Sequence, residues 1–101
     1  MTKYKLVAYT NAVSGKDEAF NAWYDNQHIR DVCAIPGILS AERMTCVGEG
    51  PHRYMTIYEI ETDDIDGVMA ELGQRAGTEA MPITDALDET TTAATVWRPM
   101  A

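Results

Sequence analysis

The spacing of apolar residues changes along the chain, and these changes predict a series of secondary-structure elements. Residues 4–9 are compatible with a strand and carry apolar side chains on both of its faces. A helix follows, beginning near Ser14 as a candidate N-cap and ending at the Pro36-Gly37 pair. Residues 39–47 and 54–61 then have the composition of two strands, joined by a loop of glycine and proline. We expect these two strands to form a hairpin.

The second half of the chain predicts one more helix and one more strand. Apolar residues recur at helical spacing from Ile65 onward, after polar residues that can cap the helix and before Gly77 as its stop. Residues 78–91 are mixed in composition and are either a lid or a connector. Residues 92–98 form the last strand. The order βαββαβ predicts an α+β, ferredoxin-like sandwich in a single domain of residues 1–101.

Both faces of the predicted sheet carry apolar or aromatic side chains. On the strand of residues 54–61, Tyr58 and Ile60 point to opposite faces from Met55 and Ile57. Helices cover only one face in this arrangement, so the other face is expected to meet a partner. A chain of 101 residues also buries a modest fraction of its surface, and self-association would stabilise it. We therefore expect a homodimer that forms through the open face of the sheet.

Charge and cysteine content exclude several classes of function. The chain has 16 acidic and 8 basic residues and a formal net charge of −8, which opposes binding to nucleic acid and to anionic membranes. Cys33 and Cys46 show no CxxC spacing, so we expect reduced thiols and no metal site. The apolar run near the N-terminus is too short for a signal peptide or a membrane span. A cytoplasmic protein is expected.

The first predicted helix carries a stripe that changes character halfway along. The stripe is aromatic at its start and polar at its end, in the order Phe20, Trp23, Tyr24, Gln27, His28 and Asp31. Ile29 and Val32 lie beside this stripe, so the second half of the helix is expected to bury a different face. Buried polar side chains need partners. The pattern therefore predicts a polar pocket lined by aromatic rings.

His28 and Asp31 are the candidates for chemistry in this pocket. They lie one helical turn apart, so Asp31 is placed to orient or charge the imidazole. Histidine has an ordinary pKa near neutrality and is suited to proton transfer. The alternative is that His28 is a hydrogen-bonded packing residue and that Asp31 only solvates the helix end. The second histidine, His52, lies in a turn and is expected to be exposed.

Other polar and aromatic residues are candidates for ligand contact. Tyr54 and Tyr58 share one face of their strand, so their hydroxyls either point into a cavity or pack within the sheet. Arg43 can clamp a carboxylate or a phenolate in its guanidinium fork, or form a surface ion pair. Trp23 is most simply a core residue, and Trp97 a core residue or a dimer contact.

The motif around His28 resembles the EthD-like branch of the dimeric α+β barrel proteins. The resemblance is carried by Trp23, Tyr24, His28, Asp31, Pro36, Gly37, Tyr58 and Glu59. It covers the larger, N-terminal part of the chain, and the last part matches only in its layout. The resemblance implies small ferredoxin-like subunits whose sheets pair to close a barrel. It does not define one reaction, because proteins of this branch and their relatives carry different activities.

Absent motifs narrow the reaction classes further. The chain has no P-loop, no dinucleotide fingerprint, no GxSxG elbow and no HExxH motif. Nucleophilic and nucleotide chemistry are thus disfavoured, and we expect no cofactor and no metal. Haem ligation by His28 is disfavoured because the resemblance is to a branch with no general haem requirement, and haem binding belongs to more distant relatives of this architecture.

The leading hypothesis is a cofactor-independent acid–base enzyme of the lyase, cyclase or decarboxylase type. Its substrate would be a small aromatic or polyketide-like molecule held by Trp23 and Tyr24. His28, held by Asp31, would move a proton next to a carbonyl or phenol. Developing charge on the substrate oxygen would be stabilised by substrate-binding residues on the strands, namely Arg43, Tyr54 or Tyr58. The alternatives are a non-catalytic dimer that binds a small hydrophobic ligand, and a structural dimer whose interior is filled by side chains.

Overall fold

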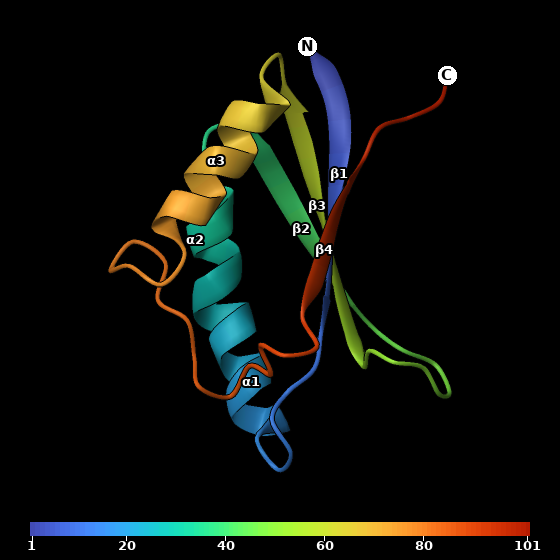
Figure 1. Cartoon of the computed structure of the whole chain (residues 1–101), viewed down its shortest axis with the longest axis vertical. Coiled ribbons are helices and arrows are strands. Elements are labelled where there is room, and N and C mark those ends of the chain that lie inside the picture. The colour runs from blue at the N-terminus through green and yellow to red at the C-terminus, as the bar shows by residue number, and fades with distance from the viewer.

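The computed structural model describes the whole chain, Met1–Ala101. Its four strands, which form one antiparallel sheet in the order β2-β3-β1-β4, are β1 (Thr2–Thr10), β2 (Ile38–Thr45), β3 (Tyr54–Thr62) and β4 (Ala93–Trp97). The helical segments, which gather on one side of the sheet (Figure 1), are α1 (Asp17–Trp23), η1 (Tyr24–His28), α2 (Ile29–Cys33) and α3 (Ile65–Arg75). This is the ferredoxin-like arrangement that the sequence predicts, including the β2–β3 hairpin.

The core lies between the helices and one face of the sheet. Leu6 of β1 is paired with Tyr58 of β3, and both side chains are buried under the helices. The fully or nearly fully buried apolar residues are Leu6, Phe20, Tyr24, Val32, Ile35, Ile38, Tyr58, Ile60, Val68, Met81 and Ala86. The opposite face of the sheet carries no helix. Trp97 lies on this open face and is 56% exposed. Of its two expected roles, core residue or dimer contact, the first is therefore wrong.

The first helix is continuous but contains a π-helical turn, η1, between its two α-helical parts. The N–H of Ile29 donates to the carbonyl of Tyr24, five residues earlier, in place of the usual four. The π turn takes up about one extra residue and rotates everything after it. As a result Val32 joins Phe20 and Tyr24 in the core, although a regular helix would place it beside their stripe. The second half of the helix was expected to bury a different face, but η1 turns Val32 into the same core as the first half.

The helix ends show which capping predictions hold. Asp64 caps α3, because its Oδ1 accepts the N–H of Gly67 at 3.0 Å, and Gly77 follows the helix with a φ of +83°. Ser14 is not the N-cap of α1: that position is Lys16, which makes no side-chain cap, and Asp17 in the first turn faces the positive end of the helix dipole. No helix is long and apolar enough to cross a membrane.

The segment of residues 78–91 is an irregular connector pinned at two points. Met81 and Ala86 are completely buried, and the carbonyl of Ala86 accepts the N–H of Val13 at 2.7 Å. No helical turn forms in it. Its end is held by His52 of the β2–β3 loop, whose Nε2 lies 2.7 Å from the carbonyl oxygen of Thr91. His52 is therefore half-buried in a contact between two segments, and the expectation that it is exposed was wrong.

Candidate functional site

An aromatic cluster forms around His28 where α1 meets η1. The imidazole stacks on the indole of Trp23, with ring centroids 4.4 Å apart and an interplanar angle of 23°. The ring of Tyr24 meets the same imidazole edge to face, at 5.0 Å and 82°. The two aromatics that precede the histidine in the sequence are thus its direct neighbours. The aromatic rings of the predicted pocket thus lie around His28 as an aromatic niche, but the larger cavities of the molecule are lined by other residues.

Burial determines the protonation state of His28. Its Nδ1 atom is enclosed and has no hydrogen-bond partner. Burial lowers the pKa of His28 to about 4, and the negative charge of Asp31 opposes this only in part. The imidazole is consequently neutral at pH 7. Its ordinary pKa, on which the sequence argument for proton transfer relied, does not apply in the folded protein.

Asp31 does not contact His28 directly. No hydrogen bond or ion pair joins the two side chains, and Oδ2 of Asp31 instead accepts Nε2–H of Gln27 at 3.0 Å. The predicted orienting contact is therefore absent, because the carboxylate bonds the amide one turn earlier on the same helix. Asp31 acts on His28 only through its charge.

Tyr24 and Tyr58 meet beneath the helix. Their hydroxyl oxygens lie 3.0 Å apart in a buried hydrogen bond between η1 and β3. Burial raises the pKa of Tyr58 well above its usual range, and the neighbouring Tyr24 raises it further. Tyr58 therefore stays protonated at all ordinary pH values and is able to donate a hydrogen bond.

Arg43 of β2 reaches the same tyrosine from the other side. Its guanidinium carbon lies 4.4 Å from the centroid of the Tyr24 ring, and its side chain is only 16% exposed. Nη1 donates to Oδ1 of Asp25 at 3.1 Å, and Nη2 donates to Oδ1 of Asn21 at 3.0 Å. Arg43 was expected either to clamp an anionic ligand or to form a surface ion pair. It does form an ion pair, with Asp25, but its guanidinium is packed against the ring of Tyr24 and is largely buried.

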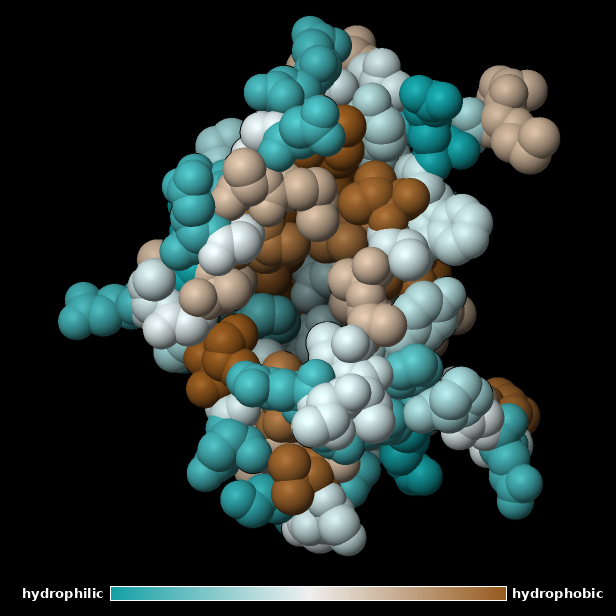
Figure 2. Space-filling view, in the orientation of Figure 1, coloured by the Kyte–Doolittle hydropathy of each residue, from teal (hydrophilic) through white to brown (hydrophobic).

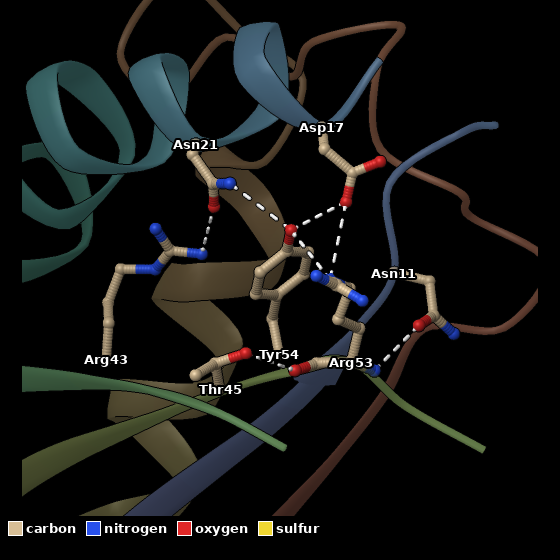
Figure 3. Close-up of polar contacts among 7 residues, drawn as sticks. All are labelled: Asn11, Asp17, Asn21, Arg43, Thr45, Arg53 and Tyr54. Carbon is tan, nitrogen blue, oxygen red and sulfur yellow. Dashed lines mark hydrogen bonds and ion pairs between the residues drawn. The ribbon is translucent and has the colours of Figure 1, made fainter. Parts of the chain in front are cut away.

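Tyr54 belongs to a polar network at the start of α1. Its hydroxyl donates to Oδ2 of Asp17 at 2.6 Å and accepts N–H groups of Asn21 and Arg53, each at 3.3 Å (Figure 3). It does not join the hydroxyl pair of Tyr24 and Tyr58. Sequence reasoning missed this network, since its members are ordinary surface residue types from two segments that are distant in the sequence.

The connector of residues 78–91 also takes part in the site. The indole N–H of Trp23 donates to the carbonyl oxygen of Pro82 at 3.1 Å. Trp23 is the residue on which His28 stacks, so a segment distant in sequence fixes the wall of the niche. No motif marks this contact; the only signal is the apolar character of Met81 and Leu87 around Pro82.

A hollow lies between the helices and the sheet. Figure 2 shows the molecule indented near the middle of this face, with hydrophobic residues on the upper rim. A cavity of about 420 Å³ opens between α3 and β4, lined by Tyr4, Ile65, Asp66, Met69, Val96, Trp97 and Arg98. The space has the mixed apolar and polar lining that small-molecule sites require.

Solved structures match this fold over nearly its whole length, at low sequence identity. A protein of Shewanella loihica PV-4 proposed to be a monooxygenase has a TM-score of 0.69 at 14% identity, over 99% of this chain and 96% of its own. The haem degrader MhuD of Mycobacterium tuberculosis, solved with two haems in its active site, has a TM-score of 0.67 at 13% identity, over 97% and 96%. An EthD family protein of Bacillus halodurans C-125 has a TM-score of 0.51 at 17% identity, over 99% and 100%.

These matches define the class of fold. The chain shares the ferredoxin-like α+β fold of these proteins, and a member of the EthD family, which its motif resembles, is among the structural neighbours. No protein-family model and no curated protein matches the sequence.

Proposed function

We propose that this protein binds a small aromatic or polyketide-like molecule against the rings of Trp23 and Tyr24, and that His28 accepts a proton from it without a cofactor. One observation carries the proposal: a neutral imidazole stands between the rings of Trp23 and Tyr24. A neutral imidazole is ready to accept a proton at pH 7. The fold class supports small-molecule chemistry by analogy only.

The reaction would begin with proton abstraction next to a carbonyl group. Nε2 of His28 takes the proton, and the electron pair of the broken C–H bond moves to the carbonyl oxygen, giving an enolate. The enolate then expels a leaving group from the β carbon, which takes the proton from His28, or its carbon attacks a second carbonyl carbon to close a ring. In a decarboxylation no C–H bond is broken, because loss of carbon dioxide from a β-keto carboxylate itself gives the enolate, which is then protonated at carbon. The ring of Tyr24 contacts the imidazole, and its hydroxyl would donate to the enolate oxygen while accepting that of Tyr58.

The low pKa of His28 sets a limit on this chemistry. A base with a pKa of about 4 takes a proton readily only from an acidic carbon or phenol, or after a bound ligand has changed its surroundings. Substrates with two carbonyl groups flanking one carbon, or with a phenol, meet this condition. The same low pKa favours the alternative, a non-catalytic module in which the aromatic niche holds the ligand and His28 only packs against it.

Proton exchange into a model ketone tests the proposal directly. Deuterium uptake at the carbon between the two carbonyl groups of benzoylacetone in deuterium oxide is followed by NMR. We expect the protein to accelerate the uptake and His28→Gln to return it to the buffer rate. His52→Gln, the matched variant of the only other histidine, should retain the acceleration.

Two results would change the assignment. Unchanged acceleration in His28→Gln would exclude His28 as the base. Binding of the ketone, seen as a shift of the Trp23 indole signal, without any accelerated uptake would favour the non-catalytic module.

The open face of the sheet supports a homodimer as part of the same proposal. Side chains of the face away from the helices include Val7, Met44, Met55, Ile57 and Trp97. Lys5 and Glu59 lie in the same face and pair at 3.5 Å, which limits the unpaired charge that a second copy would cover. An apolar sheet face without a covering layer is a typical association surface. Pairing through it would leave the His28 niche on the outer, helical side of each subunit.

A further inference from the structure

A second cavity lies on the other side of Tyr24 from His28. It has a volume of about 270 Å³, opens between the start of the first helix and strand β2, and is lined by Asn21, Arg43, Met44, Thr45 and Tyr54. Four of these five residues have polar side chains with hydrogen-bonding groups. The cavity is separate from the one between α3 and β4, since the two share no lining residue.

Arg43 offers hydrogen-bond donors that the protein does not use. A guanidinium carries five N–H groups, and only one on Nη1 and one on Nη2 have protein acceptors. Nε is buried without a partner. The second N–H on each terminal nitrogen is therefore available for a further acceptor, and two such groups side by side match the two oxygens of a carboxylate.

Aromatic rings hold the guanidinium in position. Its central carbon lies 4.4 Å from the ring centroid of Tyr24, 5.5 Å from that of Tyr54 and 5.6 Å from that of Phe20. Stacking of this kind leaves the edge of the guanidinium plane free for an anion while covering its face. The arginine is thus preorganised whether or not its carboxylate partner stays in place.

The resident carboxylate, Asp25, is weakly held. It lies on η1 with its side chain 60% exposed, and it contacts Arg43 through a single oxygen. An exposed ion pair of this kind contributes little to stability. A ligand carboxylate that bonded both terminal nitrogens would replace one hydrogen bond by two.

A second positive charge lies close by. Nε–H of Arg53 donates to the hydroxyl oxygen of Tyr54, which also accepts an N–H of the Asn21 amide in the cavity wall (Figure 3). Arg43 and Arg53, two of the chain's eight basic residues, thus both lie against Tyr54, although the formal net charge of the protein is −8. The charge is partly offset by Asp17, whose Oδ2 lies 3.8 Å from Nε of Arg53.

We infer that this cavity binds the carboxylate of a small planar acid, and that Arg43 exchanges Asp25 for the ligand. The second N–H of the Asn21 amide would bond a remaining lone pair of the carboxylate, and the Thr45 hydroxyl would bond another by leaving the carbonyl oxygen of Arg53, to which it donates at 3.3 Å. The inference goes beyond the proposed function, because it concerns a different cavity and requires nothing of His28.

Titration with benzoate, followed by NMR of the arginine Nε–H and side-chain amide signals, tests it. Benzoate should shift the signals of Arg43 and Asn21, and benzamide, its neutral analogue, should not. Arg43→Lys keeps the charge but loses the fork, and should weaken benzoate binding about tenfold. Asp25→Asn removes the competitor and should tighten binding by about twofold to fivefold, the range that an exposed ion pair permits.

Asp85→Asn is the matched control. Asp85 also forms an exposed ion pair, with Lys16 at 3.8 Å, and its replacement removes the same charge away from the cavity. The inference is overturned if benzoate and benzamide shift the same signals equally, or if Asp85→Asn tightens binding as much as Asp25→Asn does. Should Arg43→Lys fail to fold, the comparison of the two aspartate variants decides the question alone.

Discussion

The hydroxyl groups of Tyr24 and Tyr58 lie 3.0 Å apart in the buried centre of the molecule. This hydrogen bond joins the π turn of the first helix to a central strand of the sheet. It is also where the surroundings of His28 and of Arg43 meet, because the ring of Tyr24 contacts both of these side chains. A substitution at either tyrosine should therefore change both the free energy of unfolding and the NMR signals of the His28 and Arg43 side chains.

The two tyrosine hydroxyls should be coupled, so that replacing both destabilises the protein by less than the sum of the two single replacements. Tyr58→Phe leaves the hydroxyl of Tyr24 buried without its partner, so we expect the free energy of unfolding to fall by about 1–3 kcal/mol. Tyr24→Phe should have a similar effect. The double variant removes both hydroxyls, and its loss should be smaller than the sum of the two single losses. Urea unfolding of the four proteins measures this cycle, and strictly additive losses would contradict a shared hydrogen bond.

The lowered pKa of His28 predicts a loss of stability in mild acid. In the unfolded chain the imidazole has a pKa of 6.5, and in the folded protein about 4, so the unfolded state binds more protons between these values. The contribution is fully present above about pH 6.5 and is lost as the pH falls towards 4. Its upper bound is about 3 kcal/mol.

The variant His28→Gln isolates this effect from the acidic groups. Its free energy of unfolding should vary less between pH 7 and pH 4 than that of the original chain, by up to about 3 kcal/mol. NMR titration of the imidazole gives the pKa independently. A folded-state pKa near 6.5 would show that burial does not control His28.

Trp23 should control the environment of His28. Trp23→Phe keeps an aromatic ring but removes the hydrogen bond to Pro82, and should lower the free energy of unfolding by about 1 kcal/mol. A looser niche admits water to the imidazole, so the pKa of His28 should rise from about 4 towards its usual value. Trp97→Phe is the control, because that indole is over half exposed and bonds only Thr95 of its own strand. Equal pKa shifts in both variants would exclude a local role for Trp23.

The open sheet face predicts a dimer that one charge should disrupt. Ile57→Lys places an ammonium group among apolar side chains of this face, whereas Gln74→Lys adds the same charge to an exposed position on α3. We expect native mass spectrometry to find dimers of the original chain and of Gln74→Lys, and monomers of Ile57→Lys. The same spectra would reveal any small molecule that copurifies. A monomeric original chain would contradict association through this face.

The layout of the fold was predictable from sequence because it depends on local signals. The apolar spacing after Ile65, the Asp64 cap and the glycine and proline breaks each mark an element, and the structure contains those elements in the predicted order. The motif around His28 likewise predicted that the rings of Trp23 and Tyr24 lie beside the imidazole, and they do. Such signals lie within a few residues of the feature that they specify.

The remaining features depend on contacts between distant segments. The bond from Trp23 to Pro82 and the network of Tyr54 with Asp17 join parts of the chain whose approach no local pattern encodes. Gln27 and His28 lie four and three residues before Asp31, so both are within reach of its carboxylate, and spacing alone does not show that Gln27 bonds it. The pKa of His28 depends on the depth of burial, which follows only from the packed structure.

The π turn has a consequence for comparing this chain with its relatives. Because η1 takes up one residue inside an otherwise regular helix, a relative with an unbroken helix would be one residue shorter there. Its equivalent of His28 would then stand one position nearer to its equivalent of Phe20. An alignment that forbids gaps within helices would miss that correspondence and pair His28 with the wrong residue.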